Sequence, residues 1–384
     1  MAVTTQLATI DRRAATWGVV AVLVAVAIAV LGSGNLRWFD AALVGYLFGT
    51  LFAIFAVVYR YLIWLRRPPT AVLNRRGWEA FRRPGRRARN AAALPGLVVT
   101  NLLVQSFIRG RSRTRWLAHQ LVFWGCVLAG LVTFPLVFGL LHFESVGQNG
   151  REYRTFVAGL GTVELDSRSV LGWVTFHLLD ISAVLVLAGV FVFLARRLRD
   201  PGALATERSN DFLALAGLFA VSVTGLALTA SNLWMEGRFY VFLNTTHALT
   251  VILGLMYLPF GKLFHIFQRP ANLGVAYYRR EGATGPQQHC ARCGEPYAAA
   301  LQVGDLKEVL PQVGFDYDIP HVGEPPPPGA TGATTKAATT TGATAATQAA
   351  AAPPASADSY QDRCPRCRRV LVALAQSRRV GGFG

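Results

Sequence analysis

The stretch NTTHALTVILGLMYLPFGKLFHIF, residues 244–267, combines the composition of a membrane-spanning helix with two histidines. A bilayer span needs roughly 20 mostly apolar residues. His247 and His265 are eighteen residues apart, or five helical turns, so one continuous helix would place both on the same face. At a rise of about 1.5 Å per residue they would lie about 27 Å apart, nearly the thickness of the hydrocarbon core. The stretch therefore predicts one imidazole near each membrane surface.

The rest of the chain has the composition of a multi-pass membrane protein. Of its 384 residues, 52% are hydrophobic and 15% are charged, whereas soluble domains average about 25% charged residues. We expect an all-α membrane protein with about six transmembrane helices, the last four forming a histidine-rich bundle. The expected spans are 15–32, 41–65, 116–142, 169–195, 211–230 and 238–267.

The net charge of +17 is concentrated in a few connections. Segment 66–115 contains thirteen arginines and one acidic residue, Glu79. Because basic connections stay on the cytoplasmic side, we expect a multi-pass protein of the cell membrane with both termini in the cytoplasm. Attraction to anionic lipid also accounts for the arginines, so nucleic acid is not an expected partner. Residues 95–108 are apolar but too short to span, and we expect a helix at the cytoplasmic interface.

Four of the seven histidines lie inside apolar runs, and the four are His119, His177, His247 and His265. Polar residues within spans are costly and usually functional, although a single histidine also serves simply to hydrogen-bond a neighbouring helix. Counted from the expected helix ends, His177 and His247 match in depth near the outer surface, and His119 and His265 match near the inner surface. His142 lies about 140° around its helix from His119, so we expect it to be an interfacial residue.

Two histidine pairs, one in each leaflet, favour two haem b groups, because haem iron takes axial histidines in electron-transfer cytochromes. A zinc or non-haem iron site would gather its histidines at one depth, and a proton relay would need several buried carboxylates. The obvious carboxylate is Asp180, three residues after His177. It is a candidate to orient His177, to accept protons from a quinol as a catalytic residue, or to make a structural hydrogen bond.

Two segments carry a family resemblance. HALTVILGLMYLPFGKLFHIFQRP, residues 247–270, resembles the last helix of the respiratory nitrate reductase gamma-subunit superfamily, which includes heterodisulfide-reductase-like membrane cytochromes b. RTRWLAHQLVFWG, residues 113–125, is similar to that family's first haem-binding helix. The resemblance spans residues 95–280. It implies quinol oxidation at the membrane, with electrons passed to a cytoplasmic Fe–S or molybdopterin oxidoreductase partner.

By this resemblance, His247 and His265 are axial ligands of the two haems, and His119 is the partner ligand of the cytoplasmic-side haem. The nitrate reductase subunits place two histidines ten residues apart on one helix. This sequence has Ala129 and Arg109 at those distances from His119. We therefore expect His177, on another helix, to complete the outer pair.

The cysteines predict a metal site in the C-terminal tail. Two C-x2-C motifs, CARC and CPRC, contain Cys290, Cys293, Cys364 and Cys367. Paired motifs of this kind are typical of a tetrahedral thiolate site. Structural zinc is the favoured ion, and the alternatives are iron, as in a rubredoxin, or thiols that are free or redox-active. Zinc would stabilise a docking module, whereas iron would extend the path of the electrons.

The chain thus divides into five expected parts. They are two N-terminal helices (1–66), a basic segment with an interfacial helix (67–115), a four-helix dihaem core (116–268), a metal-ribbon module (269–322 with 359–384), and a disordered Pro/Ala/Thr-rich insert (323–358). Two other functions stay open. One is a haem-free solute transporter, although no pair of spans is broken in corresponding halves; the other is a membrane adaptor that docks through its zinc ribbon.

Overall fold

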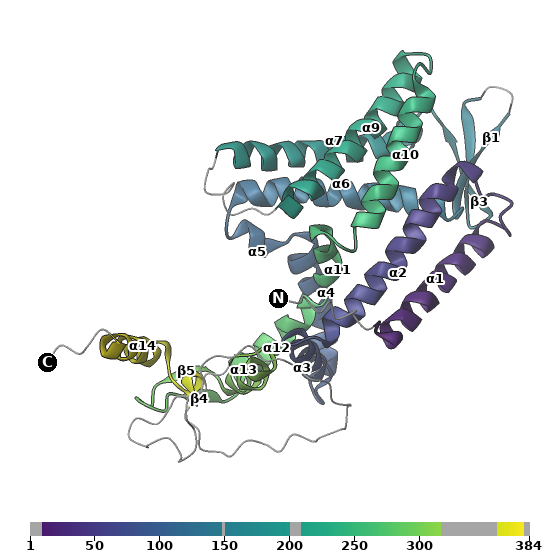
Figure 1. Ribbon diagram of the computed structural model, residues 1–384. Coiled ribbons are helices and arrows are strands. Elements are labelled where there is room, and N and C mark those ends of the chain that lie inside the picture. The colour runs from purple at the N-terminus through teal and green to yellow at the C-terminus, as the bar shows by residue number, and fades with distance from the viewer. Residues whose placement is uncertain (1–9, 148–149, 200–208, 316–358, 380–384) are drawn as a thin grey trace, which may run out of the picture. The chain divides into compact units, whose positions relative to one another are not determined.

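The computed structural model describes residues 10–147, 150–199, 209–315 and 359–379 (Figure 1). The chain forms two compact units, Met1–Ala276 and Tyr277–Gly384. Within the described residues, six helices are long and apolar enough to cross a membrane, which confirms the expected mostly helical, six-span architecture. These helices are α1 (Arg12–Gly32), α2 (Val44–Arg66), α6 (Arg113–Val137), α7 (Val170–Arg199), α9 (Ser209–Trp234) and α10 (Tyr240–Tyr257).

Helices α6 and α7 run side by side and form the most extensive helix–helix contact of the first unit (Figure 1). A Cβ added to Gly125 of α6 would lie 2.8 Å from the carbonyl oxygen of Ser182 on α7. Reciprocally, a Cβ on Gly189 of α7 would lie 2.7 Å from the carbonyl oxygen of Ala118 on α6. Small residues allow such close approach of membrane helices. The contact fixes the helix that carries His119 against the helix that carries His177.

The remaining spans extend from this pair. Helix α9 packs against both α7 and α10, helix α10 also packs against α2, and α2 packs against α1. A short 3-10 turn, η1 (Ala41–Leu43), precedes α2. The ion pair between Arg66 and Asp11 (2.8 Å) joins the end of α2 to the start of α1. These two helices therefore form an antiparallel hairpin beside the four later spans.

A three-stranded antiparallel sheet connects α6 to α7, and the sequence did not predict it. Its strands are β1 (Leu141–Val146), β2 (Glu152–Val157) and β3 (Leu160–Asp166). The expected span 116–142 is therefore too long, because α6 ends at Val137 and is followed by Gly139 with φ of +65°. His142 lies on β1, where its ring stacks between Trp38 (5.2 Å) and Phe156 (4.8 Å). It is a residue of the sheet, not of a helix end.

The sixth span is broken, so the expectation of one continuous helix over 238–267 is wrong. Helix α10 ends at Tyr257, and the chain then turns before η3 (Lys262–Phe264) and the short helix α11 (His265–Gln268). Pro259 cannot continue the hydrogen-bond ladder of the helix. Arg60 of α2 donates a hydrogen bond to the Pro259 carbonyl, which satisfies one backbone group at the break. The five-turn spacing of His247 and His265 therefore does not describe their placement.

The basic segment is helical and is tied to the third span. It contains α3 (Thr70–Arg82), α4 (Arg87–Val98), the π-helical turn η2 (Val99–Leu103) and α5 (Ser106–Arg109). The Val104 carbonyl accepts hydrogen bonds from Trp116 Nε1 (2.6 Å) and Gln120 Nε2 (3.1 Å). The stretch 95–108 is thus the end of α4, the π turn and α5 instead of one helix.

The second unit is small and mixed. Helix α12 (Asn272–Thr284) runs into it, and the antiparallel strands β4 (Gln287–His289) and β5 (Pro296–Ala299) precede α13 (Ala300–Gln312). The turn η4 (Tyr360–Asp362) and helix α14 (Pro365–Arg379) complete it. The insert expected at 323–358 lies outside the described residues.

Candidate functional site

The inner histidine pair comes together in the first unit. His119 lies on the first turns of α6, and His265 begins α11. Their ring centroids are 6.3 Å apart and the ring planes are inclined at 69°. Two residues far apart in the sequence therefore lie in an edge-on ring contact, and their role as a ligand pair at one depth stays a prediction.

The inner pair fits ligation of one metal ion between the two rings. His119 Nδ1 is buried and has no hydrogen-bond partner among the described residues. His265 Nδ1 lies 2.7 Å from the Lys262 carbonyl oxygen, which is the contact that orients most metal-binding imidazoles and leaves Nε2 for the metal. Because imidazole nitrogen binds transition metals at about 2 Å, ligating rings on opposite sides of one ion have centroids about 6 Å apart. The separation of the two rings thus leaves room for one ion between them.

The outer pair is arranged differently. His177 Nδ1 lies 2.9 Å from the Trp173 carbonyl oxygen, and its ring stacks on the indole of Trp173 at 4.6 Å. His247 Nδ1 lies 2.9 Å from Thr224 Oγ1 on α9. Helix α9 packs against the helices of both histidines, and no ring contact between the two is found within the described ranges. Both rings are held through Nδ1, and their pairing stays a prediction.

Asp180 has a direct partner on the neighbouring helix. Thr229 Oγ1 of α9 donates a hydrogen bond of 2.7 Å to Asp180 Oδ1. This contact joins α7 to α9 in the part of α7 that carries His177. The structural hydrogen bond, one of the three roles left open for Asp180, is therefore present, and its roles toward His177 and a quinol stay predictions.

An apolar pocket of about 400 Å³, absent from the sequence-based expectations, lies between the sheet and helices α6 and α7. None of the residues that line it is charged, and its polar groups are three threonines. Thr162 Oγ1 donates to the Thr155 carbonyl at 2.9 Å, and Thr175 Oγ1 donates to the Leu171 carbonyl at 2.8 Å. Thr155 Oγ1 is buried and has no partner among the described residues. The pocket therefore offers one unused hydroxyl in neutral, apolar surroundings.

The four cysteines of the second unit gather into one cluster that can hold a metal ion. The sulfurs of Cys290, Cys293, Cys364 and Cys367 all lie within 4.8 Å of one another. The Sγ atoms of Cys293 and Cys364 are 3.8 Å apart. In a tetrahedral thiolate site with metal–sulfur bonds of about 2.3 Å, the sulfurs are about 3.8 Å apart. The prediction that the two C-x2-C motifs meet across the long insert is confirmed.

Backbone N–H groups donate hydrogen bonds to two of the four sulfurs. The N–H of Cys364 donates to Cys290 Sγ at 3.3 Å, and this bond is the main reason that the pKa of Cys290 is lowered to about 6. The N–H of Cys367 donates to Cys364 Sγ at 3.5 Å. Burial, followed by the neighbouring sulfurs, raises the pKa of Cys367 to about 12. At neutral pH the metal-free cluster thus has a ready thiolate at Cys290 and a protonated thiol at Cys367.

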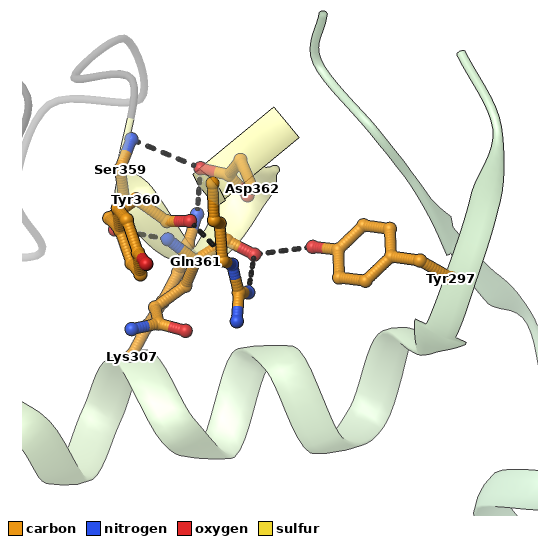
Figure 2. Close-up of polar contacts among 7 residues, drawn as sticks. Tyr297, Lys307, Ser359, Tyr360, Gln361 and Asp362 are labelled. Atoms are coloured by element: carbon orange, nitrogen blue, oxygen red, sulfur yellow. Dashed lines mark hydrogen bonds and ion pairs between the residues drawn. The ribbon is translucent and has the colours of Figure 1, made fainter. Parts of the chain in front are cut away.

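Polar contacts hold the second cysteine motif against the first part of the unit (Figure 2). The Gln361 carbonyl accepts hydrogen bonds from Tyr297 Oη and from Arg368 Nη2, the second at 3.0 Å. Lys307 Nζ of α13 pairs with Asp362 Oδ2 at 2.5 Å. In Figure 2, Tyr297 and Lys307 reach the turn from two sides. The closure of the cluster therefore depends on these contacts as well as on the cysteines.

Comparison of the chain with protein-family models, curated proteins and solved structures finds no match. The fold and the cysteine cluster define its class: a multi-pass membrane protein with a four-cysteine module that can hold a metal ion.

Proposed function

We propose that this protein is a membrane dihaem cytochrome b subunit. It passes electrons between the quinone pool and a cytoplasmic Fe–S or molybdenum oxidoreductase partner. The observation that carries the proposal is the inner pair, in which His119 and His265 face each other with centroids 6.3 Å apart. A buried imidazole nitrogen without a partner is costly, and coordination of iron by Nδ1 of His119 would account for it.

The proposal gives each histidine a defined part. His119 and His265 hold the inner haem, and His177 and His247 hold the outer one. When bound, haem iron supplies one-electron exchange. The Lys262 carbonyl and the Thr224 hydroxyl fix the orientations of His265 and His247 through their Nδ1 atoms.

We place the quinol site in the apolar pocket beneath the sheet. Its lining on α7 includes Val174, Thr175 and Leu178, which flank His177 in the sequence. Neutral walls favour an uncharged ring, and the hydroxyl of Thr155 is available to a quinone oxygen. Asp180 does not line this pocket. In this proposal it holds α9 through Thr229 and is the nearest carboxylate in sequence to His177, so it stays a candidate proton acceptor.

The four-cysteine module would face the cytoplasm if both termini lie there, as the basic connections predict. Structural zinc is the favoured ion, and it would keep the module folded as a docking site for the oxidoreductase partner. Iron at the same sulfurs would instead let the module receive electrons. Metal content and the absorption spectrum of the purified protein distinguish the two, because zinc thiolates are colourless in the visible range and iron thiolates are not.

The test of the main proposal is a reduced-minus-oxidised absorption spectrum of the full-length protein purified from membranes. We expect low-spin b-type haem at two per chain. Protein that is fully folded and free of haem would overturn the proposal. A quinol analogue should reduce the haem, and failure of that step alone would overturn the quinol assignment and not the haem assignment.

The adaptor function remains the second candidate, because the four-cysteine module is a compact unit of its own. Haem-free protein that still captures a soluble oxidoreductase through this module would favour it.

A further inference from the structure

A groove of about 550 Å³ runs along helix α2 and is closed on its other side by the break in the sixth span. Its residues on α2 recur at steps of three and four from Phe52 to Trp64, which is one continuous face of the helix, and Arg67 follows directly after the helix end. That face is about 18 Å long. Phe260, Phe264 and Gln268 form the opposite wall. The groove is therefore long and narrow, and it exists because α10 ends before these three residues.

The lining of the groove changes from apolar to cationic along its length. Phe52 and Phe55 line one end, and Arg67 lies at the other. Tyr59 and Trp64 are found between them, and such amphipathic rings prefer the headgroup level of a membrane. This order matches the polarity of a lipid molecule from its acyl chain to its headgroup.

The polar end has positive charge without a counter-ion from the protein. The Arg60 side chain already has partners within the protein. It donates to the Pro259 carbonyl, and its guanidinium lies 4.3 Å above the Phe264 ring. The Arg67 side chain makes no hydrogen bond or ion pair within the described part of the chain. No acidic residue lines the groove, and the adjacent Asp11 pairs with Arg66 at 2.8 Å. An anionic ligand is therefore the expected partner of Arg67.

We propose that this groove binds one anionic phospholipid. Its phosphate contacts Arg67 and Gln268, and an acyl chain lies along the face of α2 toward Phe52. A neutral quinone would leave the guanidinium without a counter-ion. A free phosphate would leave the apolar length of the groove unfilled. Basic recesses between membrane helices bind acidic headgroups in this way.

The bound lipid bridges α2 and the break that precedes His265, since Phe264 is part of the groove wall. It would thereby stabilise the turn that positions the inner histidine. The proposal does not depend on haem, because every residue that defines the groove lies outside the two histidine pairs.

The test is native mass spectrometry of full-length protein, delipidated in detergent and titrated with phosphatidylglycerol or phosphatidylcholine of identical acyl chains. We expect one phosphatidylglycerol to bind about tenfold more tightly than phosphatidylcholine, because the choline cation of phosphatidylcholine offsets the phosphate charge beside Arg67. Equal binding of the two lipids would overturn the proposal. Excess inorganic phosphate should not displace the lipid; full displacement would assign the site to a free anion instead.

Two variants and one control locate the site. Arg67→Gln removes the charge, and Gln268→Glu adds an opposing charge with little change in size; each should weaken phosphatidylglycerol binding about tenfold. The control is Arg13→Gln, an exposed arginine at the same end of the α1–α2 hairpin but not in the groove. Circular dichroism verifies that the variants fold. Unchanged binding in both groove variants, or equal weakening in the control, would refute the assignment.

Discussion

His119 and His265 face each other at 6.3 Å although the sixth span ends at Tyr257, before His265 is reached. The inner pair thus depends on a break and a separate short helix, not on a regular five-turn spacing. The turn at Pro259 and Gly261 sets the direction in which α11 begins, and α6 supplies the facing ring. The two rings that the depth count paired lie close together, whereas the continuous helix assumed for 238–267 is absent; their shared ligation of a haem stays a prediction.

His265→Ala should remove one of the two proposed haems. The variant loses an axial ligand of the inner haem, whereas His177 and His247 remain for the outer one. Haem per protein, measured by a pyridine haemochrome assay, should fall from two to one. His142→Phe is the matched control, because His142 stacks between Trp38 and Phe156 on the sheet and should retain both haems. Two haems in His265→Ala would contradict the inner pairing.

Arg60→Gln should loosen the break in the sixth span. The change removes the hydrogen bond to the Pro259 carbonyl and the contact with the Phe264 ring. Loss of a partner for a buried carbonyl costs about 1–3 kcal/mol, so thermal unfolding in detergent should occur at lower temperature. The absorption of the inner haem should shift as well, because His265 follows Phe264 directly. Arg89→Gln, at an exposed position, should change stability by less than about 0.5 kcal/mol.

Cys364→Ser should abolish metal binding by the second unit. Cys364 contacts two other cysteines of the cluster, since its sulfur is 3.8 Å from that of Cys293 and its N–H donates to Cys290 Sγ. Inductively coupled plasma mass spectrometry should find one zinc ion per chain in the unmodified protein and none in the variant, while the iron of the two proposed haems stays unchanged. Cys126→Ser, which changes the cysteine of helix α6, should keep the ion. A full complement of metal in Cys364→Ser would exclude the four-sulfur site.

Metal binding at this cluster should release protons, and the pKa values of the cysteines indicate which thiols release them. Cys290, with its pKa lowered to about 6, is already a thiolate at pH 7.5 and contributes little. Cys367, with its pKa raised to about 12, is protonated and must lose its proton to bind the ion. Metal affinity should therefore fall as the pH is lowered, and more steeply below about pH 6, where Cys290 also takes up a proton. Zinc titrations at several pH values with a dye-reported proton count test this order.

The sequence predicted what depends on composition and on motif chemistry. The apolar runs predicted the six spans. The two C-x2-C motifs predicted that Cys290 and Cys364 meet across a long insert, because a metal ion of this kind takes thiolate ligands from both motifs. The break at Pro259 had a visible signal, a proline and Gly261 two residues apart, but membrane helices also tolerate proline. At the break the Pro259 carbonyl is satisfied by Arg60, 199 residues away in the sequence, and no local pattern reports that contact. Strand pairing is likewise non-local, so the sheet around His142 was not foreseen.

Thr155→Val and Thr162→Val form a matched pair that separates ligand binding from folding in the pocket beneath the sheet. The same substitution removes an unpaired buried hydroxyl at Thr155 and a hydroxyl already bonded to the Thr155 carbonyl at Thr162. Without ligand, Thr155→Val should be neutral or stabilising by about 1 kcal/mol, and Thr162→Val should be destabilising by about 1 kcal/mol.

For binding of a soluble naphthoquinone, followed by fluorescence quenching, the order of the two variants should reverse. Thr155→Val should bind about tenfold more weakly, because the hydroxyl that meets the quinone oxygen is gone. Thr162→Val should bind like the unmodified protein, since its hydroxyl is committed to the backbone. If Thr155→Val were both less stable and unchanged in quinone binding, Thr155 would be a structural residue, and the quinol site would have to be sought elsewhere on the membrane unit.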